Sequence, residues 1–192
     1  MKTQVIGVLC LAFAVVSCIE KESKEEKEVV DENTMVESLQ ERGEYLVSIM
    51  DCIICHTPKK MTDNGPVPDM GRYMMGFDSS QSLPPVPDNV PMGPWTLFSG
   101  DLTVFIGPWG TSYSGNITPH KTGIGNWTLG QFSKAIRDGK YKGLDNSRPI
   151  MPPMPVGAFK NLTDKDVEAI FTYLKSIKPI DNVVPAYQPP SS

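Results

Sequence analysis

The stretch Cys52-Ile53-Ile54-Cys55-His56 decides how the rest of this 192-residue chain is interpreted. Its two cysteines are three positions apart, which places both thiols on one turn of a helix. Thiols at that spacing reach the two vinyl groups of a haem and form thioethers. The histidine that follows at once lies under the iron and offers it an imidazole nitrogen. The motif therefore predicts one covalently attached haem c, with His56 as an axial ligand of the iron.

The N-terminus has the pattern of an export signal. A short positive start is followed by an apolar run over residues 5–16, which is too short for a permanent membrane helix. The run ends in Val-Val-Ser-Cys at residues 15–18, which resembles a bacterial lipobox. We therefore expect a signal peptide over residues 1–17 and a lipid on Cys18. The alternative is an ordinary secretory signal with a chance cysteine.

Residues 18–33 are predicted to be a lipidated N-terminus and a disordered acidic tether. From residue 19 onward the segment has seven acidic residues, three lysines and no aromatic residue, so it buries too little apolar surface to order itself. The tether holds a charge of −4, equal to the net charge of the whole chain, so the remaining domain is nearly neutral. This balance gives no indication of nucleic-acid binding.

These features predict an exported protein that is anchored by lipid to a bacterial membrane and faces the periplasm or the cell surface. The acidic, lysine-containing tether resembles a surface-export signal of some bacterial groups. Cys10 leaves with the signal peptide and Cys18 takes the lipid, which leaves Cys52 and Cys55 in the folded part. No disulfide framework is therefore expected.

A helix is predicted to begin at Thr34 and to run directly into Cys52. Thr34 and Glu37 fit a capping box, and apolar residues follow at helical spacing. Gly43 lies on the same apolar stripe. From the residues alone, this glycine either allows close packing of another element or is a tolerated surface glycine.

Two further helices are predicted from capping boxes at their N-termini. Thr128 with Gln131 caps a helix that ends at Gly139. The second pair, Thr163 with Asp166, caps the last helix, which stops before a proline at position 179.

The long segment between the first two helices, residues 57–116, lacks a helical period and is rich in proline and glycine. It also carries methionine and aromatic residues that are too apolar for a free linker. We predict an irregular insertion packed over the haem and the helices. Residues 102–106 fit a short strand, with no obvious partner.

The sixth position on the iron has few candidate ligands. Met151 and Met154 lie in a proline-rich stretch that holds the chain extended. The remaining candidate is His120, whose alternative is an exposed imidazole in a loop. The chemistry alone does not choose between the methionines, since either can instead fill a gap in the core.

Three blocks in order resemble a monohaem class I c-type cytochrome, and most closely the cytochrome subunit domains of bacterial membrane-bound alcohol dehydrogenases. The blocks are the haem motif after an amphipathic helix, residues 116–140 (NITPHKTGIGNW, then a helix and Arg-Asp-Gly), and residues 151–177 (MPPMP, then a threonine-capped helix). The resemblance spans about residues 34–185.

The resemblance implies an all-α fold with helices around one covalent haem, to which the residues themselves add the long irregular loop insertion described above. It favours Met154 as the sixth ligand, because the methionine of this family precedes the capping threonine by nine residues, as Met154 precedes Thr163. It implies that the carbonyl of Pro66, in Gly65-Pro66, accepts a hydrogen bond from the axial histidine.

The resemblance also implies a close crossing of the first and last helices, with Gly43 against Tyr173. His120 departs from the family pattern, which has an acidic residue there and a loop one residue longer. The domain is expected to cover residues 34–185, followed by a C-terminal tail over 186–192.

These expectations favour an electron carrier that is not itself an enzyme. Its partners would be redox proteins: a dehydrogenase, an oxidase or another cytochrome. The alternatives are a haem subunit of such a complex, a five-coordinate catalytic or gas-binding haem protein, and a zinc or thiol role for the cysteines. A group of basic residues either steers an acidic partner or is a solvated helix face: Lys134, Arg137, Lys140, Lys142 and Arg148.

Overall fold

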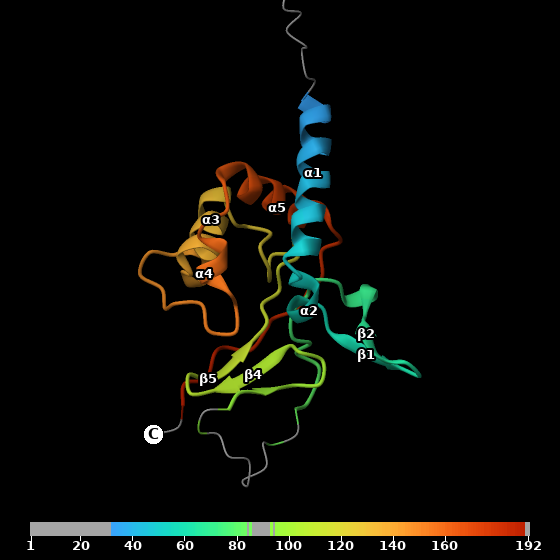
Figure 1. The fold of residues 1–192 in the computed structure, drawn as a ribbon, viewed down its shortest axis with the longest axis vertical. Helices are drawn as coiled ribbons and strands as arrows, with labels where there is room; N and C mark the ends of the chain where they lie inside the picture. The colour runs from blue at the N-terminus through green and yellow to red at the C-terminus, as the bar shows by residue number, and fades with distance from the viewer. Residues whose placement is uncertain (1–31, 84, 86–92, 94, 191–192) are drawn as a thin grey trace, which may run out of the picture. The chain divides into compact units, whose positions relative to one another are not determined.

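The computed structural model describes residues 32–83, 85, 93 and 95–190 (Figure 1). The predictions for the signal peptide, Cys18 and most of the tether concern residues outside this part. The described elements are α1 (Glu32–Ile49), α2 (Cys52–His56), β1 (Lys59–Thr62), β2 (Gly65–Pro68), η1 (Met70–Arg72), β3 (Leu97–Phe98), β4 (Val104–Gly107), β5 (Gly110–Tyr113), α3 (Leu129–Asp138), η2 (Tyr141–Gly143), α4 (Val156–Phe159) and α5 (Asp164–Ser176).

Helices α1 and α5 lie side by side, and the contact depends on a glycine. A Cβ atom on Gly43 would lie 2.0 Å from the carbonyl oxygen of Ala169 and 2.7 Å from the Cβ of Tyr173. No side chain fits in that space. The guanidinium of Arg42 pairs with Asp166 across the same contact at 2.9 Å. The expected close crossing at Gly43 and Tyr173 is therefore confirmed.

The helix caps are confirmed for α3 and α5. Both hydrogen bonds of the capping box form between Thr128 and Gln131, and α3 stops at Gly139, whose φ is +65°. At α5 the hydroxyl of Thr163 accepts a hydrogen bond from the amide of Asp166. The capping box at Thr34 is wrong, because the described helix already includes residues 32 and 33.

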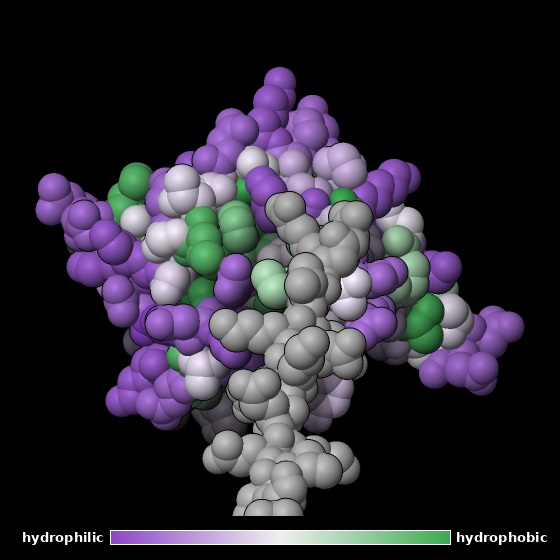
Figure 2. Space-filling model, turned by 90° about the horizontal axis from the view of Figure 1, so that it is seen from above, coloured by the Kyte–Doolittle hydropathy of each residue, from purple (hydrophilic) through white to green (hydrophobic). Residues whose placement is uncertain are grey.

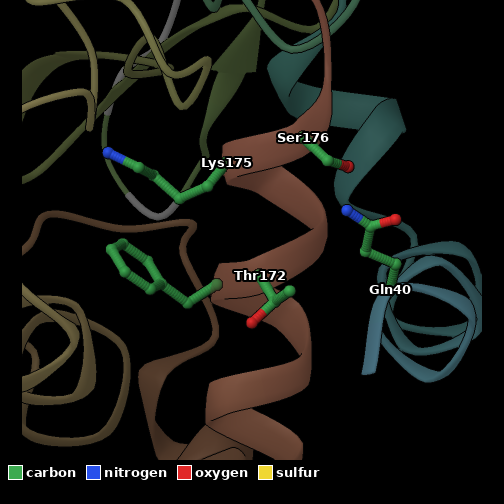
Figure 3. A pocket seen from close by; sticks show the side chains of 5 residues that line it. Gln40, Thr172, Lys175 and Ser176 are labelled. Carbon is green, nitrogen blue, oxygen red and sulfur yellow. The ribbon is translucent and has the colours of Figure 1, made fainter. Parts of the chain in front are cut away.

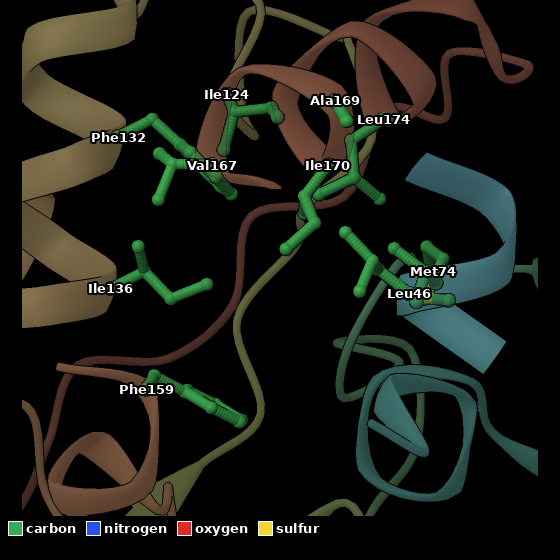
Figure 4. Packing of buried hydrophobic residues seen from close by; sticks show 11 residues of the cluster. Leu46, Met74, Ile124, Phe132, Ile136, Phe159, Val167, Ala169, Ile170 and Leu174 are labelled. Atoms are coloured by element: carbon green, nitrogen blue, oxygen red, sulfur yellow. The ribbon is translucent and has the colours of Figure 1, made fainter. Parts of the chain in front are cut away.

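The core is one apolar cluster to which most helices contribute (Figure 4). Side chains from α3 and α5 face each other and meet Leu46 of α1 and the buried Met74. The cluster consists of Leu46, Val47, Met74, Ile124, Phe132, Ile136, Phe159, Val167, Ala169, Ile170 and Leu174. Cys52, Ile53 and Met154 pack at its edge.

Between α2 and α3 the chain is more regular than expected. Strands β1 and β2 form an antiparallel hairpin directly after the haem motif. Strands β3, β4 and β5 form a second antiparallel sheet, in the order β3-β4-β5. The predicted strand at 102–106 is shifted to β4, and it has partners on both sides. The expectation of an all-α fold with an irregular insertion is corrected to helices with two small sheets.

The C-terminal segment packs against the domain instead of leaving it. Asn182 is buried, and its side-chain amide donates to the carbonyls of Met75 and Phe77, at 2.7 Å each. Further along, Gln188 exchanges two backbone hydrogen bonds with Thr111 of β5, at 2.8 and 3.0 Å. The described chain therefore ends beside β5, within the predicted tail (Figure 1).

No helix among the described residues is long and apolar enough to cross a membrane. The face seen in Figure 2 is mostly hydrophilic, and its hydrophobic residues form separate patches.

Candidate haem site

The haem motif forms its own one-turn helix, α2, directly after α1. Asp51 separates the two helices because it has a left-handed backbone conformation, with φ +56° and ψ +36°. The thiols of Cys52 and Cys55 are free, partly buried and one turn apart. This is the spacing that attachment of a haem through two thioethers requires.

Burial favours the protonated form of both thiols. Burial raises the pKa of Cys52 to about 11 and also raises the pKa of Cys55. Thiolates that bind metals or exchange disulfides have a lowered pKa instead. Within the described ranges, no three His, Cys, Asp or Glu side chains are grouped closely enough to hold a metal ion.

The imidazole of His56 is oriented by a backbone carbonyl. Its Nδ1 lies 2.8 Å from the carbonyl oxygen of Gly115. Since a carbonyl only accepts hydrogen bonds, Nδ1 carries the proton and Nε2 keeps its lone pair. Burial lowers the pKa of His56, although the Gly115 carbonyl opposes this shift. A neutral imidazole with a free Nε2 is the form that ligates iron.

Two irregular segments, residues 74–77 and 114–117, place the Gly115 carbonyl at His56. Residues 74–77 and 114–117 run side by side through hydrogen bonds from Phe77 to Ser114 (2.9 Å) and from Ile117 to Met74 (3.0 Å). The amide of Gly76 donates to the carbonyl of His56 itself at 2.8 Å. Residues 74–77 therefore hydrogen-bond both to α2 and to the segment that carries Gly115.

The expected acceptor at Gly65-Pro66 is wrong. These two residues begin β2, and the Gly65 carbonyl accepts from the hydroxyl of Thr62 inside the β1–β2 hairpin. Gly115 performs the role instead. It directly precedes Asn116, the first residue of a block already matched to the family. That adjacency is the signal in the sequence that could have identified it.

Two more residues that the sequence reading missed fix the end of α2. The ammonium of Lys59 donates to the carbonyls of Ile54 and Thr57, which are otherwise free at the helix C-terminus. Thr57 is completely buried, and its hydroxyl accepts from the amide of Met74 at 3.0 Å. The sequence could have suggested the role of Lys59, because a lysine shortly after a helix end often binds the last carbonyls. No pattern in the sequence pointed to Thr57.

The structure separates the two candidate methionines by their surroundings. Met154 packs against the core cluster, as Cys52 also does, whereas Met151 is not among the residues packed against it. A tight turn at Pro155 follows Met154, with φ −84° and ψ +56°. Its hydrogen bond runs from the Val156 amide to the Met154 carbonyl at 2.9 Å. This turn connects Met154 rigidly to α4.

His120 lies in the loop before α3. Its Nδ1 is 2.8 Å from the hydroxyl of Thr122 and 3.5 Å from the carboxylate of Asp181. The imidazole thus contacts its own loop and the C-terminal segment, as a structural side chain would.

The predicted basic group is partly neutralised. Lys134 pairs with Asp145, and Arg137 pairs with Asp164 at 2.7 Å. The guanidinium of Arg148 lies over the ring of Tyr141, 3.9 Å from its centroid, and also faces Tyr187. The interpretation as a solvated, internally paired surface gains support from these contacts.

A hollow of about 330 Å³ lies between α1 and α5 (Figure 3). It is lined by Gln40, Phe171, Thr172, Lys175 and Ser176. The Lys175 ammonium donates to the carbonyl of Gly125. The hollow contains none of the predicted haem residues, and we assign no function to it.

Comparison with known proteins gives the family. The sequence model of the family described as Cytochrome c matches residues 40–178. The chain therefore belongs to the cytochrome c family. Free cysteines one turn apart, a neutral histidine with an available nitrogen and an adjacent apolar cluster all fit the covalent haem c that this family carries.

Similar proteins include cytochrome subunits of bacterial dehydrogenases. The fructose dehydrogenase cytochrome subunit of Gluconobacter japonicus is 35% identical over 78% of this chain and 24% of the relative. The alcohol dehydrogenase (quinone) cytochrome c subunit of Gluconobacter oxydans (strain 621H) is 32% identical over 75% of this chain and 23% of the relative.

A third relative, the gluconate 2-dehydrogenase cytochrome c subunit of Pantoea cypripedii, is 32% identical over 71% of this chain and 23% of the relative. The chain thus spans about a quarter of the length of these three relatives. The resemblance to dehydrogenase cytochrome subunits is confirmed.

Proposed function

We propose that this protein is an electron carrier with one haem c, held by Cys52 and Cys55 and ligated by His56 and Met154. The observation that carries the proposal is the 2.8 Å contact between His56 Nδ1 and the Gly115 carbonyl. When bound, the haem supplies the one-electron couple between ferric and ferrous iron. The protein needs no catalytic residue for this function.

The backbone around His56 orients its ring for ligation. The hydrogen bond to Gly115 fixes both the tautomer and the rotation of the ring. An imidazole that donates from Nδ1 is also the more basic ligand at Nε2, and a more basic ligand stabilises the ferric state. The Gly115 carbonyl therefore helps to set the reduction potential.

Met154 is preferred to Met151 on two grounds. It faces the apolar cluster that borders Cys52, and the turn at Pro155 fixes its backbone. A thioether ligand raises the reduction potential of a haem relative to a second histidine, which suits electron transfer. His120 is bonded within its own loop and is not proposed as a ligand.

The relatives named as dehydrogenase cytochrome subunits support a redox protein as the partner. A dehydrogenase is therefore the first candidate, ahead of an oxidase or another cytochrome. The chain is proposed to act as an electron carrier within such a system and not as the enzyme that oxidises the substrate.

We also propose that the protein is exported and anchored through a lipid on Cys18, so that it faces the periplasm or the cell surface. The apolar run before Cys18 and the acidic tether after it support this address. Replacing Cys18→Ala is expected to move the protein from the membrane fraction to the soluble fraction. If the variant still sediments with membranes, the lipid anchor is wrong.

Optical spectra of the haem-loaded protein test the ligand set. We expect a low-spin ferric spectrum with an iron–methionine charge-transfer band, and one haem per chain by pyridine haemochrome assay. Met154→His should abolish the methionine band, and the matched control Met151→His should keep it. A high-spin ferric spectrum or ready CO binding to the ferrous protein would contradict the carrier function. Loss of the band only in Met151→His would reverse the ligand choice.

A further inference from the structure

The β3-β4-β5 sheet contacts the segment over residues 150–155, here called the methionine loop, through a buried serine. Ser112 of β5 is 7% exposed, and its hydroxyl donates to the carbonyl of Pro152 at 2.7 Å. The indole Nε1 of Trp109 donates to the same hydroxyl oxygen at 3.1 Å. The hydroxyl has a single proton and two carbonyl oxygens near it, that of Pro152 at 2.7 Å and that of Phe105 at 3.5 Å, and the much shorter contact assigns the proton to Pro152. The hydroxyl is thus oriented toward the loop.

The methionine loop has little means of holding itself in place. Positions 152, 153 and 155 are prolines, which lack an amide proton. The loop is therefore rich in carbonyl acceptors and needs a donor from elsewhere in the protein. Among the described residues, Ser112 is the side chain that supplies such a donor between Met151 and Met154.

Both ends of the loop are anchored separately from this contact. On the upstream side the amide of Ile150 donates to the Gly139 carbonyl at 2.6 Å. On the downstream side the turn at Pro155 leads into α4. Ser112 therefore restrains the middle of the loop, two residues before Met154.

The hairpin that carries Ser112 is supported from behind by the C-terminal segment. Gln188 pairs with Thr111 through two backbone hydrogen bonds, and the Tyr187 hydroxyl donates to the Trp109 carbonyl. A Cβ atom on Gly110 would lie 2.1 Å from the Gln188 carbonyl oxygen, so the two segments are in close contact. The serine is thus presented by a well-supported strand.

We propose that Ser112 is a positioning residue for the sixth iron ligand, a role that rests on the proposed ligation by Met154. Its hydrogen bond to Pro152 keeps the methionine sulfur directed at the iron. Without that bond the loop swings away more easily, and an external ligand displaces the methionine at a lower concentration.

Titration of the ferric, haem-loaded protein with imidazole tests this role. The readout is loss of the iron–methionine band as imidazole replaces the thioether. Ser112→Ala is expected to raise the apparent imidazole affinity about tenfold, the effect of losing one buried hydrogen bond of about 1.4 kcal/mol. Ser112→Thr keeps the hydroxyl and should restore an affinity close to that of the original protein.

Ser99→Ala, at the residue that directly follows β3, is the matched control. The Ser99 hydroxyl accepts from the Val104 amide at 3.0 Å and donates to Asp101 at 2.6 Å, so its removal loosens the sheet without touching the loop. This variant should keep the original imidazole affinity.

The outcomes separate the two proposals. Equal increases in imidazole affinity for Ser99→Ala and Ser112→Ala, or an unchanged affinity in Ser112→Ala, would overturn the positioning role while leaving the methionine ligand in place. Absence of the methionine band in the unaltered protein would overturn the ligation itself, and the role of Ser112 with it.

Discussion

Gly76→Ala should disturb the haem site, although Gly76 is not itself a proposed haem ligand. Its φ of +74° lies in the left-handed region, and its amide donates to the carbonyl of His56. A Cβ atom added here would lie 2.3 Å from the Ser114 carbonyl oxygen and 2.5 Å from the carbonyl carbon of Gly115. Both contacts are with backbone, which cannot rotate away.

The magnitude of Gly76→Ala follows from these two effects. A left-handed backbone destabilises alanine by about 1 kcal/mol relative to glycine. Overpacking against the neighbouring backbone adds about 1–3 kcal/mol, for a total of about 2–4 kcal/mol. Relief of the overlap requires movement of residues 114–115, which weakens the bond between Gly115 and His56. A less basic imidazole stabilises ferric iron less, so the reduction potential should rise.

Denaturant unfolding and potentiometric titration of the haem-loaded variants measure both effects. Gly65→Ala is the matched control, because Gly65 has a φ of +101° but no atom within 4 Å of an added Cβ. It should lose about 1 kcal/mol of stability from the backbone effect alone and keep its reduction potential. If Gly76→Ala matches Gly65→Ala in both measurements, the close-approach reasoning is refuted.

Two further predictions concern the contact between α1 and α5. Gly43→Ala should lower the free energy of unfolding by about 2 kcal/mol, because overpacking against backbone at 2.0 Å costs about 3 kcal/mol and helix propensity returns about 1 kcal/mol. Gly130→Ala, whose added Cβ has its nearest neighbour at 3.9 Å, should show the gain alone in the same denaturation assay. Hydrogen bonds from the Thr163 hydroxyl and Arg42 hold the pKa of Asp166 below its usual value, so its stabilising effect is complete above about pH 4 and is lost as the pH falls through the folded-state pKa. Asp166→Asn should therefore flatten the acid side of a plot of unfolding midpoint against pH, and an unchanged acid side would contradict this prediction.

The helix predictions illustrate where local chemistry is sufficient. At Thr128 and Thr163 the capping side chain and its partner amide lie within one turn, so both the pattern and its result are visible in sequence. At Thr34 the same pattern occurs inside α1, where the preceding residues are already helical. A capping motif indicates a possible start of a helix, and whether the helix begins there depends on the conformation of the residues before it.

The strands were largely missed because their partners are set by pairing and not by a local period. Strand β3 contains two residues and β4 four, too few for an alternating pattern to stand out. The error at Gly65-Pro66 has a related origin, since a Gly-Pro pair close to the haem motif matches the family pattern by position. In the folded chain that pair lies in a hairpin, and the carbonyl of Gly115 reaches His56 instead.

The sequence by itself determined the chemistry of this protein: two thiols and an imidazole on one helical turn, two capped helices and two candidate methionines. These features depend on neighbours a few residues apart, so spacing alone reveals them. Only the tertiary structure decided which carbonyl orients His56, that Ser112 reaches the methionine loop and that the C-terminal segment supports β5. Each of those contacts joins segments far apart in the chain, and their geometry depends on how every intervening turn closes.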